Sequence, residues 1–142
     1  WKNGVENILD SDNLPSIASA VSADGATVAG MLLNQPSVGI TPVIWSNGQM
    51  IQLPKLNDAD YVNTTAISSD GKVVVGTEVN NTSSGYTKAV SWKNNVINDL
   101  TNSSKITLQS SSASSVNANG TVIVGTMSGI DNNALMSLDG FR

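Results

Sequence analysis

Cysteine and histidine are both absent from this sequence of 142 residues. Without cysteine the chain can form neither a disulfide framework nor a thiolate metal site. Without histidine it lacks the commonest general base and the commonest nitrogen ligand for metals, and a Ser-His-Asp triad cannot form. The sequence therefore predicts a protein that is not an enzyme and that carries no cofactor.

Charge is scarce as well, with 13% charged residues and a net charge of −4. The seven cations are spread along the chain without a cluster, so we expect no nucleic-acid partner. Ser, Thr and Asn make up about a third of the residues, a composition frequent in secreted and surface-exposed β proteins. No apolar run is long enough to span a membrane, and residues 1–4 do not start a signal peptide. We expect an extracellular or bacterial cell-surface location, with no membrane insertion of this chain.

What the sequence does contain is a pattern written three times. SAVSADGATVAGM starts at Ser19, TAISSDGKVVVGT at Thr65 and SSVNANGTVIVGT at Ser114, which makes Val21, Ile67 and Val116 equivalent. A second pattern follows the first, as PVIWSNGQMIQL in residues 42–53 and AVSWKNNVINDL in residues 89–100. The chain begins inside this second pattern with WKNGVENIL and ends on ALMSLDGFR, where Ser137 is predicted to take the place of the tryptophan. Repeats of about 45 residues are typical of propeller blades and related arrays.

Each repeat contains four short strand candidates separated by turn signals. Asp-Gly and Asn-Gly pairs favour tight hairpins, and a second turn is predicted at Asn47-Gly48, Asn94-Asn95 and Asp139-Gly140. The repeated Gly30, Gly76 and Gly125 indicate a bulge or a close backbone approach. No segment has a helical period, so we predict an all-β domain over 1–142, built of three tandem four-stranded antiparallel units of propeller-blade type. The units are roughly 10–53, 54–100 and 101–142.

Three blades do not usually close a ring, which leaves alternatives for the architecture. Residues 1–9 are predicted to supply the closing strand of the last unit, either within one chain or from a neighbour, so a homodimer through open terminal strands would make six blades. The chain could also be a piece of a longer array. A β-trefoil-like pseudo-threefold barrel uses three four-stranded units as well and is the alternative fold.

The two patterns resemble the bacterial extracellular HAF repeats. That family has Ser-x-Asp-Gly-x-x-Val-Val-Gly, then Ala-Phe-x-Trp, then x-Gly-x-x-x-x-Leu, and here Val43 and Val90 replace its aromatic residue while Asn119 replaces Asp. The resemblance covers nearly the whole chain. It implies an exported surface protein, in some cases an autotransporter passenger, and it brings no catalytic residues with it.

Aromatic residues are the candidates for ligand binding. Trp1, Trp45 and Trp92 recur at one repeated place, which favours packing because each repeat must bury the same anchor, although they could stack on sugar rings. Tyr61 and Tyr86 stand outside the repeated pattern and are better candidates for surface recognition. Variable loops on a rigid scaffold also suit binding.

Carboxylates give weaker candidates. Asp10 and Asp12 occupy one loop, and Asp58 and Asp60 the corresponding loop of the next unit, so either pair could share a calcium ion. A solvated loop is the simpler interpretation, because the full calcium-loop pattern is missing. Likewise Asp24, Asp70 and Asn119 precede glycine, which indicates turn residues rather than ligands. Two carboxylates across a cleft could also serve a hydrolase, but no pair stands out.

The sequence thus predicts a non-enzymatic extracellular repeat module of a bacterial surface or secreted protein, used for adhesion or ligand binding. Its partner would be a host or cell-surface protein or a glycan. A carbohydrate-binding, lectin-like domain is the first alternative, and a carboxylate-based hydrolase is the second.

Overall fold

The structure, a computed structural model, describes residues 3–33, 39–56, 59–79, 85–101, 107–130 and 136–142. It contains strands and turns, and none of these residues is helical. Accordingly, the described part of the chain holds no helix that is long and apolar enough to cross a membrane.

Eleven strands form three antiparallel sheets in which consecutive strands are neighbours. The first sheet contains β1 (Ser16–Val21), β2 (Thr27–Leu33), β3 (Ile40–Ser46) and β4 (Gln49–Gln52). The second contains β5 (Tyr61–Ile67), β6 (Val73–Val79), β7 (Thr87–Lys93) and β8 (Val96–Asp99). The third contains β9 (Thr107–Val116), β10 (Ile123–Ile130) and β11 (Met136–Phe141). The all-β, antiparallel prediction is therefore confirmed, while the third sheet has three strands rather than four.

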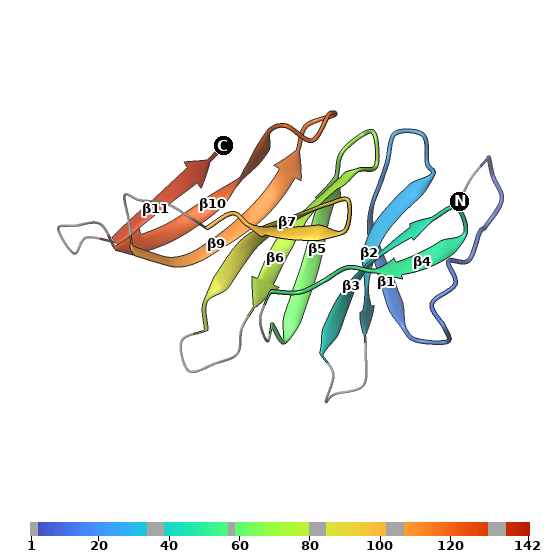
Figure 1. The fold of residues 1–142 in the computed structure, drawn as a ribbon, viewed down its shortest axis with the longest axis horizontal. Helices are drawn as coiled ribbons and strands as arrows, with labels where there is room; N and C mark the ends of the chain where they lie inside the picture. The colour runs from blue at the N-terminus through green and yellow to red at the C-terminus, as the bar shows by residue number, and fades with distance from the viewer. Residues whose placement is uncertain (1–2, 34–38, 57–58, 80–84, 102–106, 131–135) are drawn as a thin grey trace.

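The sheets stand in a row, with the second between the other two (Figure 1). The first strand of each later unit lies against the sheet of the unit before it: β5 contacts β1, β2 and β3, and β9 contacts β5, β6 and β7. This arrangement is not the closed barrel of the β-trefoil alternative. Val21, Ile67 and Val116 each end the first strand of their unit and pair with the second strand, as the repeat predicts.

The two faces of the second sheet build two separate cores. Val62, Val74 and Trp92 are buried against Ala29 of the first sheet. On the other face, a list of buried residues reaches the third sheet: Val73, Val75, Ala89 and Ala113. Strands buried on both faces read as continuous apolar runs, which explains the sequence VVV in β6.

Each repeated glycine is required by close backbone packing. An added Cβ would lie 2.1 Å from the Ile17 carbonyl oxygen at Gly30, 2.2 Å from that of Asn63 at Gly76 and 2.1 Å from that of Ser112 at Gly125. The partner strand has its register shift at this level in all three sheets. The prediction of a bulge with a close approach is confirmed.

The turn predictions are confirmed in two units and wrong in the third. Asn47-Gly48 and Asn94-Asn95 have positive φ, as tight hairpins between strands require. Asp139 and Gly140, in contrast, lie inside β11, where they pair with Met127 and Thr126. Ser137 pairs with Gly129 and so does not take the tryptophan place. The register is set instead by Phe141, which pairs with Gly125 and packs its ring there, whereas Trp45 packs against Gly30 from a neighbouring position.

Residues 3–10 do not close the third unit within the same chain. They lie beside the first sheet, and the second sheet separates them from β11 (Figure 1). Asn3 and Gly4 form a turn, and residues 6–10 after it form no strand.

Gly76→Ala tests the close approach. A Cβ at this place must push the β5 backbone away, since backbone atoms cannot yield as a flexible side chain can, and we expect a loss of about 3 kcal/mol in the free energy of unfolding. Urea unfolding monitored by tryptophan fluorescence measures it. The neighbouring Thr77→Ala is the control, expected to cost about 1 kcal/mol or less. Equal stability losses for the two variants would contradict the steric account.

Candidate functional site

The two tryptophans that the sequence offers as stacking platforms are buried. Trp45 is 4% exposed and Trp92 is 1% exposed. The Trp45 Nε1–H donates to the carbonyl oxygen of Asp10 at 2.6 Å, and the Trp92 Nε1–H donates to that of Pro54 at 2.7 Å. Each indole thus anchors the segment that follows the fourth strand of the preceding unit. This is a packing role and leaves neither ring face open to a sugar; Trp1 lies outside the described residues.

The predicted turn residues cap their own loops. Asp24 Oδ1 accepts from the Ser22 hydroxyl and the Ala26 amide, and Asp70 Oδ1 accepts from the Ser68 hydroxyl and the Lys72 amide. The hydrogen bond from Ser68 is the main reason that the pKa of Asp70 lies below its ordinary value. In the third unit Asn119 fills the same role with Thr121. An acceptor oxygen is what the turn needs, so Asn replaces Asp without loss.

The calcium candidates are not brought together. Asp10 Oδ1 accepts the backbone N–H of Asp12 at 3.1 Å and so stabilises its own turn. Asp60 precedes β5, and its carbonyl oxygen accepts the Ile40 N–H at 3.1 Å. Asp58 lies outside the described residues. Among the residues that the structure describes, no group of three or more acidic side chains could hold a metal ion.

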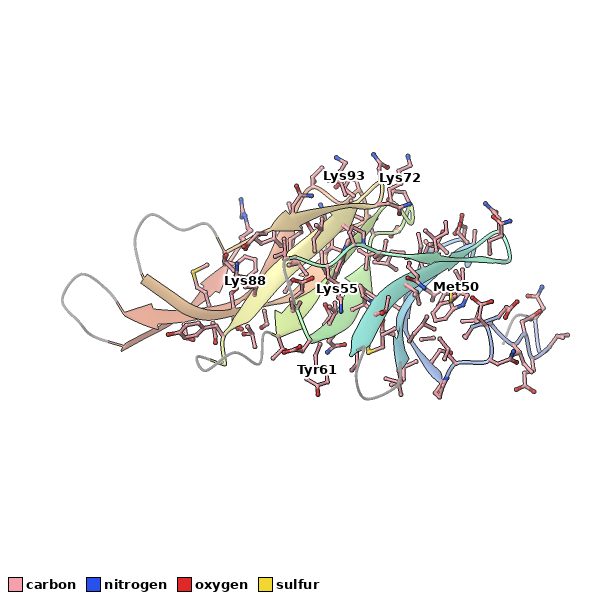
Figure 2. The ribbon with its side chains drawn as sticks, turned by 60° about the horizontal axis from the view of Figure 1, so that its bottom comes forward. Met50, Lys55, Tyr61, Lys72, Lys88 and Lys93 are labelled. Atoms are coloured by element: carbon pink, nitrogen blue, oxygen red, sulfur yellow. The ribbon has the colours of Figure 1, made fainter. Side chains whose placement is uncertain are left out.

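Both candidate tyrosines lie at one rim of the sheets, the rim where β1, β3, β5 and β7 begin and β2 and β6 end. We call it the loop rim. Tyr61 is 44% exposed and Tyr86 is 47% exposed. In Figure 2 the Tyr61 side chain projects from the side of the molecule opposite Lys72 and Lys93. The hydrogen bond from Ile40 to Asp60 joins the loop rims of the first and second sheets.

Other exposed apolar side chains share this rim. Ile17 near the start of β1 and Leu33 at the end of β2 are both exposed. They lie on the same face of the first sheet, because Ile17 pairs with Met31 and Leu33 is two residues further along β2. Leu33 pairs in turn with Ile40, which is tied to β5. The loop rim therefore presents aliphatic groups on the first sheet and tyrosines on the second.

An ion pair borders Tyr86. Lys88 Nζ lies 3.0 Å from Asp99 Oδ2 across β7 and β8. Burial alone would raise the pKa of Asp99, but hydrogen bonds from Thr101 and from Lys88 outweigh it and hold that pKa below its ordinary value. The carboxylate is thus kept ionised and fixed in place at the rim.

Beneath this pair lies a carboxyl group that sequence reasoning missed. Glu78 is 3% exposed, and its two oxygens accept the same backbone N–H, that of Leu56, at 2.9 and 3.1 Å. Burial raises its pKa above the ordinary value, while Leu56 and the nearby lysines oppose the rise. The available signal was the repeat itself, because the equivalent places two residues after the glycine hold Leu32 and Met127. A carboxylate in an apolar place deserves a reason, and here the reason is the linker that it holds.

This geometry bears on the hydrolase alternative. Glu78 and Asp99 have pKa values displaced in opposite directions, as an acid and a base would need. However, Glu78 faces the linker amide and is covered, and Asp99 is engaged by Lys88 and Thr101. The pair is better explained as support for the loop rim than as a catalytic dyad.

Glu78→Gln tests the support role. Because the folded-state pKa is raised, the folded protein holds the proton more tightly, and stability falls as the pH rises from the unfolded value near 4.5 through the folded value. The amide keeps an acceptor for the Leu56 N–H but carries no charge to desolvate. We therefore expect a higher melting temperature than wild type at pH 7 and the loss of this pH dependence. The exposed Glu6→Gln is the control; a Glu78→Gln protein that melts lower than wild type at pH 7 would refute the account.

A cavity of about 850 Å³ lies elsewhere, between residues 3–10 and the first sheet. Its lining includes Ile8, Val21, Val28 and the edge of Trp45. Ile8 is 90% exposed and Val21 is 59% exposed. The cavity is thus an open, partly apolar face of the first sheet and contains none of the tyrosines.

Comparison with known proteins bears on the fold alone. No family model matches the chain, and no curated protein sequence matches it either. Among solved structures, the chain is similar to TolB from Acinetobacter baumannii, with a TM-score of 0.51 and 14% identity over 87% of this chain and 32% of that one. It is also similar to a putative TolB from Agrobacterium tumefaciens, with a TM-score of 0.53 and 12% identity over 92% of this chain and 50% of that one. The chain spans half or less of the length of these structures, and the similarity places its antiparallel sheets among TolB-like β-propeller folds.

Proposed function

We propose that the chain is a non-enzymatic binding module of propeller-blade type, working outside the cytoplasm, and that its loop rim recognises a protein ligand. The observation that carries this proposal is the pair of exposed tyrosines at one rim of the central sheet, with Ile17 and Leu33 on the adjoining rim. Tyrosine supplies a large, rigid contact surface with a polar tip and loses little conformational entropy, so it is enriched where proteins bind one another.

The support beneath the rim fits a recognition role. Glu78 fixes the linker before β5 through Leu56, and the Lys88–Asp99 pair fixes the start of β7. Both tyrosines therefore stand next to restrained backbone rather than on independent segments. Restraint before binding lowers the entropy that a complex must lose, which favours affinity and specificity.

A glycan is the second candidate ligand. The exposed rings of Tyr61 and Tyr86 could each stack on a sugar, as the lectin-like alternative requires. The aliphatic groups at the adjoining rim favour a protein ligand instead, because Ile17 and Leu33 offer apolar contact and no hydrogen bonds to hydroxyl groups.

A selection from a random peptide library, followed by affinity measurement against variants, tests the proposal. Tyr61→Ala is expected to weaken the selected peptides at least about tenfold, the loss typical of an interface hot spot. Val96→Ala, at a 61% exposed position on β8, is the matched control and should change the affinity less than about twofold. Peptides that bind the Tyr61→Ala protein as well as wild type would refute the rim as the binding surface. A glycan array with the same two variants decides for the second candidate, and turnover of any substrate by purified protein would overturn the non-enzymatic part.

A further inference from the structure

The first and third sheets each leave one face uncovered, and the central sheet shows what should cover it. Val73 and Val75 of β6 are 4% and 0% exposed, since the third sheet lies on them. The equivalent residues of β10, Val122 and Val124, are 36% and 40% exposed. At the other end, Ala18 is exposed, while its equivalent Thr64 is 1% exposed. The outer face of the third sheet and the outer face of the first are thus two halves of the same kind of interface.

Residues 3–10 already have the form of a fourth strand and its linker, without the sheet to which these belong. Asn3 and Gly4 have φ of 52° and 78°, matching 52° and 75° at Asn47 and Gly48. The carbonyl oxygen of Asp10 receives the Trp45 indole N–H as that of Pro54 receives the Trp92 indole N–H. This segment therefore docks on the first sheet as the end of the first unit docks on the second.

The third sheet lacks the strand that this segment represents. Phe141 of β11 pairs with Gly125, as Val43 pairs with Gly30 and Val90 with Gly76. In the two four-stranded sheets, Val43 pairs onward with Gln52 and Val90 with Asp99. The repeat places Ile8 at the position of Gln52 and Asp99. β11 in the structure has β10 on one side only.

We propose that a second copy of this chain completes the third sheet, with its residues 3–9 pairing along β11 and its first sheet covering β9 and β10. In this register Ile8 of the second copy faces Phe141, and Asn7 of the second copy faces Arg142. By the same operation the first copy completes the second, so that two chains close a ring of six sheets.

The internal interfaces supply the contacts that this association repeats. The Thr65 hydroxyl donates to the Ala113 carbonyl oxygen at 2.8 Å, and the Ser19 hydroxyl lies 2.7 Å from that of Thr64. Ser114 is equivalent to Thr65 and is exposed, so its hydroxyl is free to meet Ala18 of the second copy in the same way. The turn at Gly71 packs against Ser22 and Thr27, whereas the equivalent Gly25 has open space around it. Continuity with an interface that occurs twice inside the chain is the reason for choosing a second copy as the occupant.

The length of the similar structures agrees with this choice. The chain covers 92% of itself but only 50% of the putative TolB from Agrobacterium tumefaciens. Two copies would therefore provide about as much chain as that structure contains.

Because the chain has no cysteine, a pair of introduced cysteines tests the register directly. In the Asn7→Cys/Arg142→Cys variant the two positions face each other across strands of different copies, within the Cα separation that a disulfide spans. Mild oxidation is expected to give a covalent dimer in non-reducing electrophoresis. The matched control is Glu6→Cys/Arg142→Cys, where the first cysteine is shifted by one residue and points to the other face of the strand. A monomer, a ladder of higher oligomers, or equal crosslinking in both variants would overturn the proposal.

Light scattering during gel filtration tests the covered face without oxidation. Wild type should show twice the mass of the 14.7 kDa chain at micromolar concentration. Val124→Asp places an unpaired charge in the proposed interface and is expected to weaken association at least about tenfold. Val96→Asp, at an exposed position of the central sheet, should leave the dimer unchanged. A wild-type monomer at all concentrations, or dimers in both variants, would overturn the proposal; the strength of peptide binding at Tyr61 does not enter either result.

Discussion

The structure depends on one constraint: an antiparallel sheet with apolar residues on both faces must be covered on both sides. The central sheet meets this requirement, since Val74 and Trp92 are covered by the first sheet while Val75 and Ala89 are covered by the third. The repeated glycines follow from it, because the sheets can come this close only where the bulged strand passes over a residue without a side chain. The buried indoles follow as well, since each ties the end of one unit to the next.

Much of this was predictable from the repeat, because turn chemistry and strand periodicity act locally. The hairpins at Asn47 and Asn94 need left-handed backbone, and amide side chains next to glycine or asparagine announce it. The third repeat was misaligned because ALMSLDGFR offers two settings for the last strand. The setting in the structure places Phe141 against Gly125, an aromatic contact between residues 16 positions apart that no local pattern reveals.

The candidate site was predicted only in part, for a related reason. Tyr61 and Tyr86 were recognisable because they fall outside the repeated pattern, and exposure of both follows from their places at strand starts. Glu78 was missed, although it replaces Leu32 and Met127 of the other units, because its partner is a backbone amide 22 residues earlier. Side-chain contacts to backbone depend on how linkers cross a sheet, and the linker path is a tertiary property.

The placement of the two chain ends on opposite sides of the central sheet has a mechanical consequence. A tensile force applied at residue 3 and residue 142 of one chain would pass through all three sheets in series. Hairpins connected in sequence order can peel strand by strand, so such a force would extend the molecule in steps rather than rupture it at once. A protein held at both ends under flow would then act as a yielding spring, with each sheet absorbing work before the next one opens.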